Sequence, residues 1–116
     1  MALKHRYNKK LDLTKAGTGV EYIEDDAVES GKILVYESIA VVDENSSLSY
    51  IRIGAMTPSY YELWEEELAP NANELCFSQE EHTIRELQRF RCEINGGTAN
   101  DKIHVYLTGY WQNWRE

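Results

Sequence analysis

The sequence TIRELQRFRCEINGGTANDKIHVYLTGYW, residues 83–111, decides the expected fold. Apolar side chains alternate with polar ones in two parts of it, first at Phe90, Cys92 and Ile94 and then at Ile103, Val105 and Leu107. A period of two is typical of an antiparallel strand with one face on a core and one face in water. Residues 95–101, rich in Gly, Asn and Asp, provide the positive-φ positions that a hairpin turn needs. The stretch therefore predicts a β-hairpin, and it points to no reaction.

The rest of the chain predicts further short strands over residues 20–23, 32–43, 48–55, 60–63 and 74–78. Residues 32–43 are apolar on both faces, which indicates a central strand or one with a bulge near Glu37 and Ser38; with 48–55 it forms a second expected hairpin. One helical turn is expected over 64–68. In residues 80–91, the spacing of Ile84, Leu87 and Phe90 would suit a helix, but strand, tight turn and strand is the preferred interpretation.

These elements predict an all-β protein, an antiparallel β-sandwich or jelly roll of about 7–8 strands. Residues 1–19 lack a clean period and end in Ala-Gly-Thr-Gly, so they are expected to form an extended basic N-terminal arm, with residues 20–116 as the β-sandwich domain. No apolar run approaches the length of a membrane span, and no apolar segment of a signal peptide follows Met1. Cys76 and Cys92 are expected to be reduced thiols of a protein made in a cytoplasm.

Charge is distributed unevenly along the chain. The net charge of −8 argues against direct binding of nucleic acid. Residues 1–15 hold five basic residues and one acidic residue, a net charge of +4, which leaves −12 on the other 101 residues. Such a division suggests that the arm meets an acidic surface, which includes a neighbouring copy of this chain; the alternative is a solvated, mobile terminus.

No recognisable catalytic, metal or cofactor motif is present in the sequence. Its three His and two Cys have no zinc-ligand spacing, and His104 falls on the polar face of its strand. Asp43-x-Asn45 and Asn100-Asp101 offer oxygens for calcium but lack a longer ligand array, so turn formation is the preferred explanation. No Ser lies in a G-x-S-x-G elbow, and no phosphate loop is present. The chain is therefore predicted not to be an enzyme and to need no cofactor.

Aromatic and basic side chains are the remaining functional signal. Tyr and Trp bury a large area with few rotamers to immobilise, which makes them common anchors of protein interfaces and platforms for sugar rings. Trp111 and Trp114 are expected in a short tail after the last strand. The predicted interface residues are Lys4, Arg6, Lys9, Lys10, Tyr60, Tyr61, Trp64, Arg89, Arg91, Tyr110, Trp111 and Trp114.

Over residues 28–111 the chain resembles small β-sandwich structural proteins of tailed bacteriophages. The resemblance rests on SGKILVYESI (residues 30–39), IRIG (51–54), FRCEI (90–94), NGGTANDKI (95–103) and YLTGY (106–110). It implies a non-enzymatic virion protein, foremost a capsid cement (decoration) protein that forms a homo-oligomer, a trimer favoured, and bridges subunits of the major capsid protein in the virion. The alternatives are a tail, neck or baseplate component, and a carbohydrate-binding β-sandwich module.

Overall fold

The computed structural model describes residues 3–114, which form nine β-strands and no helix. The strands are β1 (His5–Thr14), β2 (Glu21–Glu24), β3 (Lys32–Asp43), β4 (Leu48–Met56), β5 (Tyr61–Leu68), β6 (Cys76–Ser78), β7 (His82–Arg85), β8 (Arg89–Gly96) and β9 (Lys102–Asn113). The all-β prediction is confirmed, with one strand more than the upper expected number. Within the described residues, no helix is long and apolar enough to cross a membrane.

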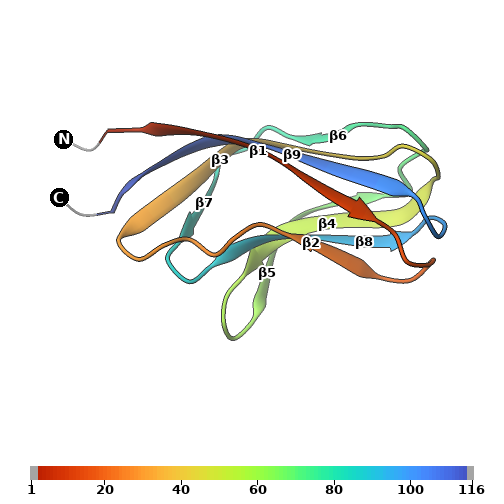
Figure 1. The fold of residues 1–116 in the computed structure, drawn as a ribbon, viewed down its shortest axis with the longest axis horizontal. Coiled ribbons are helices and arrows are strands. Elements are labelled where there is room, and N and C mark those ends of the chain that lie inside the picture. Colours follow the sequence, from red (N-terminus) through yellow and green to blue (C-terminus); the bar gives the residue numbers. More distant parts are fainter. Residues whose placement is uncertain (1–2, 115–116) are drawn as a thin grey trace.

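The strands form two antiparallel sheets that pack face to face (Figure 1). Sheet A has the order β1-β9-β3-β6, and β7 also pairs with β3; sheet B has the order β2-β8-β4-β5. If β6 and β7 are taken as one interrupted strand, the paired strands are nested along the chain: β1 pairs with β9, β2 with β8, β3 with β6 and β7, and β4 with β5. This nesting is the jelly-roll topology, one of the two predicted architectures.

Both predicted hairpins are wrong, although their strands exist. β8 lies in sheet B and β9 in sheet A, and β3 and β4 are divided in the same way. The loops 44–47 and 97–101 therefore cross from one sheet to the other. The alternating pattern decides which side chains face the core but not which strand is the hydrogen-bonded neighbour, so hairpin and crossing loop have the same sequence signature.

The core lies between the sheets and contains the residues that the alternation selected. Phe90, Cys92, Ile94, Ile103 and Val105 are fully buried, with Leu107 nearly so. Cys92 is a buried free thiol, and Cys76 is a half-buried one. The predicted bulge in β3 is confirmed as a register shift between Tyr36 and Ser38 opposite β9.

The N-terminal segment differs from the expected arm. Its residues 5–14 form β1, which pairs with β9 over its full length, so it belongs to sheet A and no boundary at residue 19 separates it from the sandwich. Tyr7, Leu11 and Leu13 face inward and pack against the core. Because polar and basic residues interrupt this weak alternation, the sequence did not reveal the strand.

Two further expectations are corrected. Residues 64–68 belong to β5 and are not a helical turn, and Trp111 lies inside β9 rather than in a tail. By contrast, the preferred interpretation of residues 80–91 is confirmed, since β7 and β8 flank a turn at Leu87, whose φ is 71°.

Candidate functional site: two sides of the sandwich with opposite charge

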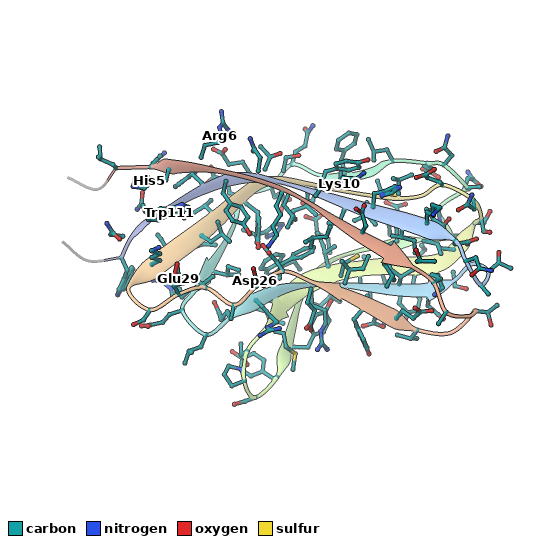
Figure 2. All side chains as sticks on the ribbon, in the orientation of Figure 1. His5, Arg6, Lys10, Asp26, Glu29 and Trp111 are labelled. Atoms are coloured by element: carbon teal, nitrogen blue, oxygen red, sulfur yellow. The ribbon has the colours of Figure 1, made fainter. Side chains whose placement is uncertain are left out.

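A basic strip runs along the free edge of sheet A, where β1 has no outer neighbour. It consists of Lys4, Arg6 and Lys10, which are all exposed, and in Figure 2 Arg6 points away from sheet B. Lys4 Nζ lies 4.4 Å from the ring centre of Tyr110, and Lys10 Nζ lies 5.8 Å from that of Tyr106. Within residues 3–114, neither Lys4 nor Arg6 has a carboxylate oxygen within 4 Å. Lys10 Nζ lies 3.6 Å from Asp12 Oδ1, between two exposed side chains, so Lys4 and Arg6 are the charges of the strip that the described fold leaves unpaired.

Apolar side chains continue from the basic strip across the outer face of sheet A. Lys10 lies opposite Tyr106, Tyr106 opposite Ala40, and Ala40 opposite Phe77 of β6. Tyr106 is 40% exposed and Phe77 is 59% exposed. A hollow of about 310 Å³ is lined by Lys4, Arg6, Gly109 and Tyr110, with Glu37 as its acidic member. This face therefore combines exposed aromatic area with a positive edge, as protein interfaces do.

Lys9 points in the opposite direction and has a structural role. Its Nζ lies 2.7 Å from Oδ1 of Asp25, whose side chain is fully buried. The hydroxyls of Tyr7 and Tyr36 donate to Asp25 Oδ2 at 2.5 and 2.9 Å. Burial alone would raise the pKa of Asp25, but these donors, Lys9 foremost, outweigh burial and lower it. Lys9, a predicted interface residue, is thus committed to holding β1 on the sandwich.

The opposite side of the molecule carries an acidic edge. Its members are exposed Glu residues on β5 and on the loops beside β6 and β7, namely Glu62, Glu66, Glu67, Glu74, Glu80 and Glu81. β5 is the last strand of sheet B, and Glu65 joins it to the sheet A strands through Ser78 and through His82, at 3.0 Å. β6 and β7, which β5 contacts, lie at one edge of sheet A, and β1 lies at the opposite edge. The acidic edge and the basic strip therefore occupy opposite sides of the sandwich.

Exposed apolar residues accompany the acidic edge as well. Leu63 is 50% exposed, Leu68 66% and Leu75 42%. The sequence pattern does not predict this surface, because the run Glu65-Glu66-Glu67 also suits the expected helical turn over 64–68. In a strand, that run places two carboxylates on one face and one on the other. Exposed leucines on an edge strand would have indicated a surface that contacts another protein.

Glu65, Glu80 and His82 are the one group of three or more His, Cys, Asp or Glu residues among the described residues whose ligating atoms all lie within 4.8 Å of one another. The His82 ring is held flat against Trp64, with ring centres 4.3 Å apart. Glu65 is already occupied by Ser78 and His82, and Glu80 is exposed. This set is explained by structural hydrogen bonding between β5 and β7.

The outer face of sheet B is neutralised by its own ion pairs. Arg91 Nε lies 2.6 Å from Glu24 Oε2, and Arg89 shares the same carboxylate at 3.4 Å. Arg52 pairs with Glu66 at 2.5 Å and with Glu93 at 3.4 Å. The two predicted interface arginines on this face therefore have partners within their own chain, and the predicted Tyr61 is half-buried beside Arg91.

The three Trp residues occupy different environments. Trp111 has the His5 ring stacked at 4.0 Å and the Lys32 ammonium at 4.2 Å; two groups this close to one ring centre must cover opposite faces. Trp64 is covered by His82 on one side and packs toward Tyr36 and Phe90.

Trp114 lies at the end of the sandwich with its ring under the Arg85 guanidinium, 4.3 Å away. It is 50% exposed and lines a hollow of about 480 Å³ together with Tyr60, which is 60% exposed. Of the predicted interface residues, the structure thus brings together Lys4, Arg6, Lys10 and Tyr110 along β1 and β9, Tyr60 and Trp114 at the end of the sandwich, and Arg89, Arg91 and Tyr61 on the outer face of sheet B. Lys9, Trp64 and Trp111 lie apart from these groups.

Comparison with known proteins gives the fold and no family. No protein-family model matches the chain, and no curated protein matches it. Among solved structures it is similar to PirA, with 12% identity, a TM-score of 0.50 and coverage of 89% of this chain and 93% of that one. It is also similar to CBM4 (9% identity, TM-score 0.47, coverage 87% and 70%) and to a chain of infectious bursal disease virus Gx strain (10%, 0.42, 97% and 30%). Likeness at this level of identity shows a shared β-sandwich fold alone.

Proposed function

We propose that this protein is a non-enzymatic structural protein of a virion, a capsid cement protein that associates with copies of itself and bridges neighbouring subunits of the major capsid protein. The observation that carries the proposal is the opposite charge of the two sides: the basic strip (Lys4, Arg6 and Lys10) and the acidic edge around β5. Exposed apolar side chains lie at both, so contact between them would bury apolar area and pair charges together.

The basic strip of one copy matches the acidic edge of the next, not itself. Such a head-to-tail contact is heterologous, and it closes into a ring when the rotation between copies permits. A trimer is the ring that the proposal favours. The outer face of sheet A, with Tyr106 and Phe77, then remains for the capsid subunits.

A tail, neck or baseplate component would use the same surfaces and differ in its partner alone. A carbohydrate-binding module has less support, because the ring faces of Trp64 and Trp111 are covered by neighbouring side chains of this chain. Sugar platforms need a ring face that is open to the ligand.

Charge reversal tests the contact. One variant, Arg6→Glu with Lys10→Glu, makes the basic strip acidic; the other, Glu62→Lys with Glu67→Lys, makes the acidic edge basic. Each alone should remain monomeric in size-exclusion chromatography with light scattering at concentrations where the unaltered chain associates. An equimolar mixture of the two should associate again, because each reversed side then meets an opposite charge.

Lys102→Glu, an exposed charge reversal outside both surfaces, is the matched control and should associate normally. If the mixture stays monomeric while both variants remain folded by circular dichroism, the head-to-tail contact is refuted. The virion assignment is tested separately by quantifying the chain in purified particles by mass spectrometry. A cement protein should be present at a fixed ratio to the major capsid protein, and its absence would refute that assignment without affecting the contact.

A further inference from the structure

Two buried carboxyl groups meet where the two crossing loops of the sandwich come together. Asp43 ends β3 and is 2% exposed; Asp101 precedes β9 and is 4% exposed. Loop 44–47 is joined to the start of β9 by two hydrogen bonds: Glu44 N donates to the backbone oxygen of Lys102 at 3.0 Å, and Lys102 N donates to the side-chain Oδ1 of Asn45 at 2.8 Å. Both carboxyl groups therefore lie in a closed corner of the fold.

Turn formation accounts for three of the four carboxyl oxygens. Asp43 Oδ1 accepts from the backbone N–H groups of Asn45 and Ser46, at 2.8 and 3.1 Å. Asp101 Oδ1 accepts from the Ser46 hydroxyl at 3.0 Å, and Asp101 Oδ2 accepts from Thr98 N at 2.9 Å. These bonds are the turn roles that the sequence suggests for Asx residues.

The fourth oxygen, Asp43 Oδ2, has no hydrogen-bond partner among the described residues although it is buried. It faces the Asp101 carboxyl group across Gly97: a methyl group at Gly97 would lie 2.8 Å from Asp101 Oδ2 and 3.2 Å from Asp43 Oδ2. A buried acceptor without a donor is costly, and one beside a second carboxylate is costlier.

The two carboxyl groups have no basic partner within the described chain. Burial and the adjacent Asp101 carboxyl raise the pKa of Asp43. Within residues 3–114, no Lys, Arg or His nitrogen lies within 4 Å of either carboxyl group. Beyond the N–H and hydroxyl donors named above, the described chain offers these carboxyl groups no cationic partner, and a proton or a bound cation can fill that place.

We propose that Asp43 and Asp101 bind a calcium ion, with Asp43 Oδ2 and the Asp101 carboxylate as its charged ligands. The side-chain atoms at this corner that could bind a metal ion are all oxygens. Besides the two carboxyl groups they include the hydroxyls of Ser46 and Thr98, which lie 2.6 Å apart beside Asp101. An all-oxygen set with two carboxylates suits Ca²⁺, which accepts 6–8 oxygens in flexible geometry at about 2.3–2.6 Å; backbone carbonyls and water would complete the set. The ion would tie together the two loops that join sheet A to sheet B.

The cluster of Glu65, Glu80 and His82 is the rival cation site, and it is less compelling. It has no buried oxygen without a partner, and its members are exposed or hydrogen-bonded within the chain. A variant of it therefore serves as the matched control for calcium binding by an acidic surface.

The test measures calcium-dependent stability of the full chain after dialysis against a chelator. CaCl₂ at about a hundred times its dissociation constant should raise the melting temperature by about 5 °C or more, and titration calorimetry should give one strong site per chain. Asp43→Asn keeps the Oδ1 acceptor and places an amide donor against Asp101, so it should fold without metal and lose the calcium response. Asp101→Asn is the second variant and should lose it too, while Glu80→Gln should respond as the unaltered chain does.

The proposal is overturned if calcium leaves the melting temperature of the unaltered chain unchanged, because the two carboxyl groups then share a proton. It is equally overturned if Asp43→Asn and Asp101→Asn keep the response, or if Glu80→Gln alone abolishes it.

Discussion

At the scale of single residues, Asp25 shows how this fold uses an ionised group inside the sandwich. Its carboxylate is fully buried, yet it stays charged because Lys9, Tyr7 and Tyr36 supply three donors from two strands of sheet A. Asp26 provides a natural comparison: it also contacts Lys9, at 3.2 Å, but its side chain is 93% exposed. Burial, more than proximity to a lysine, makes the first contact valuable.

We expect Asp25→Ala to lower the free energy of unfolding by about 2–4 kcal/mol at pH 7, because the two Tyr hydroxyls and Lys9 lose their shared acceptor. Urea unfolding measures this loss. Asp26→Ala should change it by less than about 0.5 kcal/mol. Equal effects of the two substitutions would show that the buried network contributes nothing special.

The pH dependence of stability follows from the lowered pKa of Asp25. A carboxyl group whose folded pKa is depressed stabilises the protein at pH values above its unfolded pKa of about 3.9, and that stabilisation is lost as the pH falls through the folded value. Asp25→Asn should therefore lose less stability than the unaltered chain between pH 5 and pH 2.

At the scale of elements, the pairing of β3 with β9 depends on a residue without a side chain. Gly109 lies opposite Tyr36 at the point where the register of β3 shifts. A Cβ at Gly109 would lie 1.9 Å from Val35 O and 3.0 Å from Tyr36 Cα, and both are backbone atoms that cannot rotate away. The bulge and the glycine thus form one feature, and both come from the requirement that these two strands approach closely.

Gly109→Ala should destabilise the fold by about 3 kcal/mol, because the added methyl group pushes β9 off β3 along the longest strand pair of sheet A. Gly19→Ala is the matched control, since nothing lies within 4 Å of its added Cβ, and it should leave stability within about 1 kcal/mol. Chemical denaturation of both variants checks the difference. A Gly109→Ala chain as stable as the control would show that β9 can move away from β3 at little cost.

At the scale of the whole molecule, charge is divided across the width of the sandwich as well as along the chain. The basic residues that the sequence places at its start are folded onto sheet A as β1, and the acidic run of the middle lies on β5, at the far edge of sheet B. Such polarity favours a head-to-tail contact over a two-fold symmetric one.

Association through these exposed charges should weaken with salt. Screening shortens the reach of exposed charges from about 10 Å at 0.1 M to about 3 Å at 1 M ionic strength. We expect the self-association constant, measured by sedimentation velocity, to fall about tenfold or more between 0.05 and 0.5 M NaCl. Association that strengthens with salt would mean that the exposed Leu and Phe side chains alone hold the copies together.

The alternation of apolar and polar residues was sufficient to predict the kind of fold and the inner face of most strands. The alternation around Cys92 and Val105, and the bulge near Glu37, follow from a period of two that a strand imposes on its own side chains. These properties are local, so a local pattern can carry them. For the candidate site, the uneven distribution of charge along the chain, and not the period of two, pointed to basic residues such as Arg6 and Lys10.

Which strands, rings and carboxyl groups lie next to one another became known from the folded structure. It placed β8 and β9 in different sheets, joined residues 5–14 to β9, covered both faces of Trp111, and brought Asp43 beside Asp101. Each of these facts relates residues that are distant in the chain. The physical reason is that hydrophobic alternation specifies burial without specifying the neighbour, whereas hydrogen-bonded pairing, ring stacking and the meeting of two carboxyl groups are fixed only when the two sheets close on each other.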